Sequence, residues 1–149
     1  MLKSMKSWLV DINVWLALAY DRHEHHALAR QWFEEPTSAR FCFCRLTQLG
    51  FLRLLINPAV MGRDVRTGRD AWRLYDDLIA YDRVSFVSEP AGFEHKFREL
   101  TGVSRTSHRM LPDAYVGALA HSLGYQVASF DRVFRTMPGV DALVLAPPR

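Results

Sequence analysis

The chain has 149 residues, of which 49% are hydrophobic and 23% charged, and its formal net charge is +3. This balance excludes a disordered or fibrous chain, and the length is enough to bury a substantial core in one domain, predicted over 1–149. The mild positive charge permits binding to nucleic acid but does not require it.

Cys42 and Cys44 are the only cysteines. Alternate residues of one strand pair poorly in a disulfide, and two thiols do not complete a zinc site, so we expect buried free thiols in a reducing compartment. No stretch is long and apolar enough to span a membrane, and the N-terminus lacks a signal-peptide cleavage site. We therefore expect a cytoplasmic protein that does not bind membranes.

The first predicted element is an apolar strand over 8–10 that ends at Asp11, after which apolar residues recur at helical spacing up to Tyr20. In open α/β sheets, ligands bind at the carboxyl ends of the strands. A charge between two core elements is costly unless it is paired or binds a cation, so Asp11 is a candidate functional residue. Asn13 is predicted either to cap the helix or to hydrogen-bond a metal-bound water.

Three histidines, at positions 23, 25 and 26, lie in a polar turn before a helix that ends near Pro36. Neighbouring histidines at a helix start do not all face one ion, and no acid or cysteine at ligand spacing completes a cage. We expect a solvated helix start rather than a metal site.

A second strand is predicted over 40–44, followed by a helix over 48–56 that Thr47 caps and Asn57-Pro58 ends. Gln48 lies in the first turn of this helix, from which it can reach the carboxyl edge of the sheet. A loop is predicted over 60–68, and its arginines either contact phosphate or are simply solvated.

The second half of the chain continues the alternation of helices and strands. The pattern predicts a helix over 71–80 with Trp72, Tyr75 and Ile79 in the core, a strand over 84–87 and a helix over 93–100. A polar loop then leads to a helix over 111–120, a strand over 126–131 and an edge strand over 143–145. The chain is therefore predicted to be an α/β sandwich with a mostly parallel sheet.

Two further acids follow this pattern: Asp113 in the first turn of a helix, and Asp131 at the end of a strand. Either one alone has an ordinary explanation, as a helix-start acid or a turn residue. Right-handed crossovers in a parallel sheet would bring both next to Asp11. Clustered carboxylates suit Mg²⁺ or Mn²⁺, which can activate water and polarise a phosphoryl oxygen for phosphodiester hydrolysis.

Two neighbouring features have two interpretations each. Ser129, two residues before Asp131, either touches phosphate or makes a half-buried polar contact. The residues Arg105, His108 and Arg109 either face a phosphate backbone or belong to a surface loop.

The segments 10–19, 46–58, 112–115 and 129–131 together resemble the PIN domain, and more narrowly the VapC toxins of type II toxin–antitoxin pairs. The resemblance implies a three-layer sandwich with a central sheet of four to five strands and endoribonuclease activity dependent on Mg²⁺ or Mn²⁺. It also implies a cognate VapB antitoxin, a homodimer and higher assembly with the antitoxin. Asp11, Asp113 and Asp131 match three acids of the family, as catalytic residues and metal ligands.

The chain departs from the family at Gln48, which stands where the family has a glutamate. An amide can orient water or ligate through its oxygen, but it adds no charge, so we expect weaker cation binding. Glu89 and Glu94 are the two glutamates to compare with this position. Two alternatives remain: a PIN module that binds RNA or antitoxin without cleavage, and a phosphatase with an aspartyl nucleophile. The phosphatase would need an acid at position 13, where this chain has Asn13.

Overall fold

The computed structural model describes residues 6–36, 38–103 and 105–146. Its centre is a five-stranded sheet in which every pairing between neighbouring strands is parallel. The strand order is β3-β2-β1-β4-β5, which confirms the predicted sheet. The strands are β1 (Ser7–Val10), β2 (Arg40–Phe43), β3 (Val84–Phe86), β4 (Gln126–Ser129) and β5 (Ala142–Val144).

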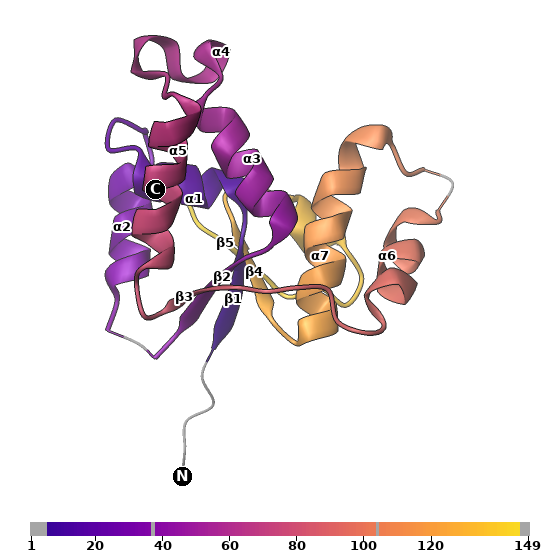
Figure 1. Cartoon of the computed structure of the whole chain (residues 1–149). Helices are drawn as coiled ribbons and strands as arrows, with labels where there is room; N and C mark the ends of the chain where they lie inside the picture. Colours follow the sequence, from indigo (N-terminus) through magenta and orange to yellow (C-terminus); the bar gives the residue numbers. More distant parts are fainter. Residues whose placement is uncertain (1–5, 37, 104, 147–149) are drawn as a thin grey trace.

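Helices cover both faces of the sheet, as the predicted three-layer sandwich requires (Figure 1). One face carries α1 (Ile12–Ala19), α2 (His26–Glu34), α3 (Arg45–Leu55) and α5 (Gly68–Ile79). The other carries α6 (Phe93–Thr101) and α7 (Leu111–Leu123). Short helical turns complete the described part: α4 (Pro58–Met61), η1 (Gly62–Asp64), η2 (His108–Met110) and η3 (Arg132–Thr136).

The alternation of side chains along β1 explains why both faces of the sheet are covered. Trp8 and Val10 belong to the core beneath α1, α2, α3 and α5, whereas Leu9 belongs to the core beneath α6 and α7. Successive residues of a strand point to opposite faces, so a strand apolar at every position must be covered on both.

Strand order places a topological switch point between β1 and β4. The chain moves from β1 to β2 and β3 on one side, then returns to β4 and β5 on the other. In open parallel sheets such a point leaves a crevice at the carboxyl ends of the strands. Asp11 directly follows β1, and Asp131 follows β4 by two residues.

Several element boundaries differ from the sequence prediction. The third helix begins at Arg45 with Cys44 as its N-cap, and the Thr47 hydroxyl accepts a hydrogen bond from the Cys44 amide at 2.9 Å. The prediction that Thr47 caps the helix was therefore wrong, because Thr47 is the inner member of a capping box. Part of the predicted loop at 60–68 is helical, and β4 stops at Ser129 rather than at Asp131.

One predicted core residue lies at the surface. Tyr75 is buried and Ile79 is partly buried, but Trp72 is 47% exposed. The buried stripe of α5 runs through Ala71, Tyr75 and Leu78, at the spacing of one helix face. Trp72 lies beside this stripe, so the core prediction was wrong for this residue.

The expectation of buried free thiols is confirmed. Both Cys42 and Cys44 are buried and free. Within the ranges that the structure describes, no helix has the length and apolar character needed to cross a membrane.

Candidate active site

Asp11 is a nearly buried carboxylate at the carboxyl end of β1, with 7% of its surface exposed. Its Oδ1 accepts the Ile12 amide at 2.8 Å and so caps α1, and its Oδ2 accepts the Ser129 hydroxyl at 2.7 Å. Burial raises the pKa of Asp11, while these two hydrogen bonds oppose the rise. The site therefore holds a desolvated carboxylate that has no basic partner among these contacts.

The Ser129 hydroxyl joins the ends of β1 and β4. It donates to Asp11 and accepts from the side-chain amide of Asn13 at 3.3 Å and from the Asp131 backbone amide at 2.9 Å. Asn13 Oδ1 in turn accepts the Phe130 amide at 3.4 Å. Of the two readings of Ser129, the structure supports a polar contact.

Asn13 does not cap α1, because the Asp11 carboxylate already does so. The prediction of a cap at Asn13 was wrong for that reason. Asn13 instead connects the first turn of α1 to the segment that follows β4. The sequence offered no local signal for this role, since these partners lie more than 110 residues apart.

Asp113 and Asp131 face the same region as Asp11. Asp113 lies in the first turn of α7, and burial together with the charges of Asp11 and Asp131 raises its pKa to about 6. Asp131 is exposed and caps η3 by accepting the Val133 amide at 2.9 Å. The mutual repulsion of the carboxylates indicates that the topology brings the three predicted acids together.

The donor chemistry of this cluster fits a hard divalent cation. Three carboxylates supply oxygen ligands and negative charge, and a cation would relieve the repulsion among them. Within residues 6–36, 38–103 and 105–146, however, no three His, Cys, Asp or Glu side chains are arranged to hold an ion. The Asp131 carboxylate is turned toward the Val133 amide. Since Mg²⁺ keeps several waters, direct contact with all three acids is not required.

Gln48 is buried in α3, and its side-chain oxygen is already engaged. Arg45 Nη1 donates to Gln48 Oε1 at 2.5 Å, and the Arg45 guanidinium lies over the Phe86 ring at 4.7 Å. The side chain at the position where the family has a glutamate is therefore hydrogen-bonded to a cationic neighbour.

Among the described residues, no hydrogen bond joins Gln48 to either glutamate chosen for comparison. Glu94 forms an exposed ion pair with Arg98 at 3.3 Å on α6. Glu89 is exposed and lines a pocket of about 130 Å³ with Arg45 and Tyr115. Burial, Cys44 and Glu89 raise the pKa of Tyr115 to about 12.

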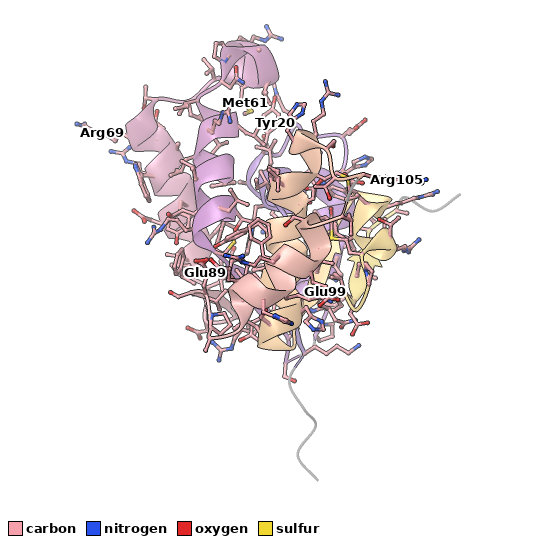
Figure 2. The ribbon with its side chains drawn as sticks, turned by 90° about the vertical axis from the view of Figure 1, so that its right-hand side faces the viewer. Tyr20, Met61, Arg69, Glu89, Glu99 and Arg105 are labelled. Atoms are coloured by element: carbon pink, nitrogen blue, oxygen red, sulfur yellow. The ribbon has the colours of Figure 1, made fainter. Side chains whose placement is uncertain are left out.

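The basic residues before α7 are exposed. His108 and Arg109 belong to η2, which leads directly into the helix that carries Asp113. In Figure 2, Arg105 and Glu89 lie to either side of the α6 and α7 ribbons. Arg109 is exposed and is therefore accessible to RNA, and its contact with RNA stays a prediction.

The raised pKa of Asp113 predicts how the metal-free protein responds to pH. Since the folded-state pKa of about 6 exceeds the ordinary value of 3.8, the folded state binds more protons between these values, and stability falls as pH rises through this window. In EDTA, Asp113→Asn should raise the free energy of unfolding by about 1–2 kcal/mol at pH 7 and by almost nothing at pH 4.

Urea unfolding at the two pH values measures this difference. Asp77→Asn, on the exposed side of α5, is the matched control and should show no such dependence on pH. An equal effect of Asp113→Asn at both pH values would contradict the raised pKa that burial and the neighbouring carboxylates give Asp113.

Comparisons with known proteins agree with this architecture. The family model of the PIN domain matches residues 8–140. Ribonuclease VapC41 of Mycobacterium tuberculosis is 34% identical over 143 residues, which cover 93% of this chain and 98% of that protein. Ribonuclease VapC38 of the same species is 31% identical over 123 residues, covering 83% of this chain and 84% of that protein.

Solved structures share the fold at low sequence identity. VapC20 of Mycobacterium tuberculosis, described as a sarcin-ricin loop cleaving toxin, aligns with a TM-score of 0.63 and 17% identity, covering 87% of this chain and 93% of that one. DNA-bound VapBC of Salmonella typhimurium aligns with a TM-score of 0.65 and 16% identity, covering 93% and 98%.

Proposed function

The chain belongs to the PIN-domain family and, within it, to the VapC ribonucleases, and from this membership we propose that it hydrolyses RNA phosphodiester bonds with a divalent cation held by Asp11, Asp113 and Asp131. The cation is Mg²⁺ or Mn²⁺, because the proposed donors are all hard oxygens. The observation that carries the proposal is the placement of the three acids at the starts of α1, α7 and η3. Burial, and then the charges of Asp11 and Asp131, raise the pKa of Asp113, as expected for a carboxylate close to the other two.

When bound, the cation would place positive charge next to a phosphoryl oxygen and would lower the pKa of a water molecule bound to it. The chain's own residues do the positioning. Asp11 is fixed by the Ile12 amide and the Ser129 hydroxyl, so its carboxylate is held in one orientation. Asp113 is carried by the first turn of α7, where the positive end of the helix dipole favours its ionised form.

Gln48 has a narrower role in this proposal than a glutamate would have. Its oxygen accepts from Arg45, so its NH₂ group is the part of the amide that remains to orient a water or a phosphate oxygen. Arg45 adds a positive charge at the same turn of α3, and this charge suits a phosphate.

Cleavage of RNA by the purified protein tests the proposal. The protein is incubated with total RNA in Mg²⁺, in Mn²⁺ and in EDTA, beside Asp113→Ala. We expect cleavage with either cation and none in EDTA or with the variant. Failure of the folded, cation-loaded wild type to cut several RNAs would contradict the proposal and favour a module that binds RNA without cleavage.

Restoring the fourth acid gives a separate prediction. Gln48→Glu should tighten Mn²⁺ binding about tenfold, because a fourth carboxylate adds attraction for the cation, partly offset by pairing with Arg45. Isothermal titration calorimetry measures the affinity. Gln31→Glu adds the same charge on the exposed side of α2 and should leave the affinity unchanged. Equal Mn²⁺ affinities for wild type and Gln48→Glu would show that the side chain at position 48 does not act on the cation.

A protein antitoxin is the partner that we propose from family membership. Structures of VapBC from Salmonella typhimurium and of VapBC-1 from Haemophilus influenzae share this fold. Co-expression with the product of a neighbouring small reading frame, followed by co-purification, tests this partner. A homodimer, and its higher assembly with antitoxin, remain predictions for the same experiment.

A further inference from the structure

Three aromatic rings meet at Phe130, which stands between Ser129 and Asp131 in the chain, and the proposed chemistry uses none of them. The Phe130 ring lies 4.9 Å from the His25 ring and 6.4 Å from the His23 ring, measured between centroids. The two histidine rings are 5.8 Å apart. All three side chains are half-buried, so the group, here called the ring cluster, retains solvent-accessible surface.

The ring cluster corrects the prediction of a solvated helix start. His25 is the N-cap residue of α2, but its side chain makes no capping hydrogen bond. Its ring and the His23 ring instead pack against the ring of Phe130, which lies more than 100 residues later in the chain. The cause is the topology, which places the turn after α1 next to the segment after β4.

One ring nitrogen of each of the three histidines has a polar partner nearby. His23 Nδ1 accepts the His25 amide at 3.0 Å, His25 Nε2 lies 3.4 Å from Glu24, and His26 Nδ1 contacts the Ala17 carbonyl oxygen at 2.7 Å. In the described part of the chain they belong to no three-residue metal group. What the cluster presents is therefore ring surface rather than metal ligands.

The ring cluster is fixed to the catalytic carboxylates through the backbone. Phe130 lies between Ser129, whose hydroxyl donates to Asp11, and Asp131. The Phe130 amide donates to Asn13, and the next amide, of Asp131, donates to the Ser129 hydroxyl. These bonds hold the Phe130 ring one residue away from a proposed metal ligand.

The bases of single-stranded RNA stack on aromatic side chains, and this contact tolerates every base because each has a π-face. Resting on the proposed function, we infer that the ring cluster of Phe130, His23 and His25 is a stacking subsite for the nucleobase beside the scissile phosphate. It positions the strand so that the phosphate reaches the carboxylates. It is a positioning subsite and takes no part in proton transfer.

The test combines protein variants with abasic RNA in the non-cleaving Asp11→Asn background. Fluorescence anisotropy measures the affinity for a short single-stranded RNA and for a series in which each nucleotide in turn lacks its base. One abasic position should weaken binding about tenfold. Adding Phe130→Leu, which keeps an apolar side chain without a ring, should weaken binding of the intact RNA similarly and abolish the abasic penalty at that position.

Trp72→Leu is the matched control, since it removes an exposed ring from α5, and should change neither value. His25→Leu should reduce the penalty, whereas His95→Leu on α6 should not. If folded Phe130→Leu kept the full loss of affinity at the abasic position that is sensitive without this substitution, the inference would be overturned. In the wild-type background, Phe130→Leu should raise KM more than it lowers kcat; wild-type protein that cuts no RNA would instead contradict the proposed function.

Discussion

Replacing Asp11 with asparagine should reduce RNA cleavage by at least about 1000-fold without loss of the fold. The substitution removes the charge of the most deeply buried proposed ligand, and an amide cannot compensate the charge of a divalent cation. The fold should survive because the side-chain oxygen can still cap α1 through the Ile12 amide. Removing a desolvated charge should also leave the thermal midpoint equal to or above that of the wild type.

Single-turnover cleavage in Mn²⁺ and thermal unfolding measure these two effects. Asp76→Asn makes the same chemical change on the exposed side of α5 and should leave both unaltered. A folded Asp11→Asn protein that cleaves RNA within tenfold of the wild-type rate would remove Asp11 from the mechanism.

Ser129→Ala should affect both stability and cleavage. The buried hydroxyl serves the Asp11 carboxylate, the Asn13 amide group and the Asp131 backbone amide, and its loss leaves each without this partner. Unsatisfied polar groups of this kind cost about 2–3 kcal/mol in total. Cleavage should fall about 10- to 100-fold, because Asp11 and the segment carrying Asp131 lose their common anchor.

Chemical unfolding and cleavage rates measure the two losses. The matched control is Ser122→Ala, which removes a hydroxyl that donates only to the Ala118 carbonyl within α7 and should cost less than about 0.5 kcal/mol. A Ser129→Ala protein as stable as this control would show that the hydroxyl does not join the two strand ends.

The sequence alone was enough to predict the order of strands and helices. Runs such as 8–10 are apolar at every position, which is typical of strands covered on both faces, and the helices between them carry helical periodicity. The parallel pairing then implied that Asp11 and Asp131 would follow neighbouring strand ends. Local patterns were sufficient here because the fold is built from short crossover units.

Contacts between distant segments were beyond local patterns. The role of Ser129 depends on the register that pairs Val10 with Ala128, and no property of either segment specifies that register. The packing of His25 on Phe130 likewise depends on the placement of two turns. At Cys44 and Thr47 both members of a capping box were visible, but the sequence did not tell which one began the helix.

Binding of Mn²⁺ in the absence of RNA tests the central claim most directly, since it separates the cation site from catalysis. Electron paramagnetic resonance counts the free ion as it is added to wild-type protein and to Asp11→Asn, Asp113→Asn and Asp131→Asn. Our account predicts saturable binding by the wild type and at least a tenfold loss of affinity in each variant. Wild-type affinity in all three folded variants would place the cation elsewhere and contradict the account.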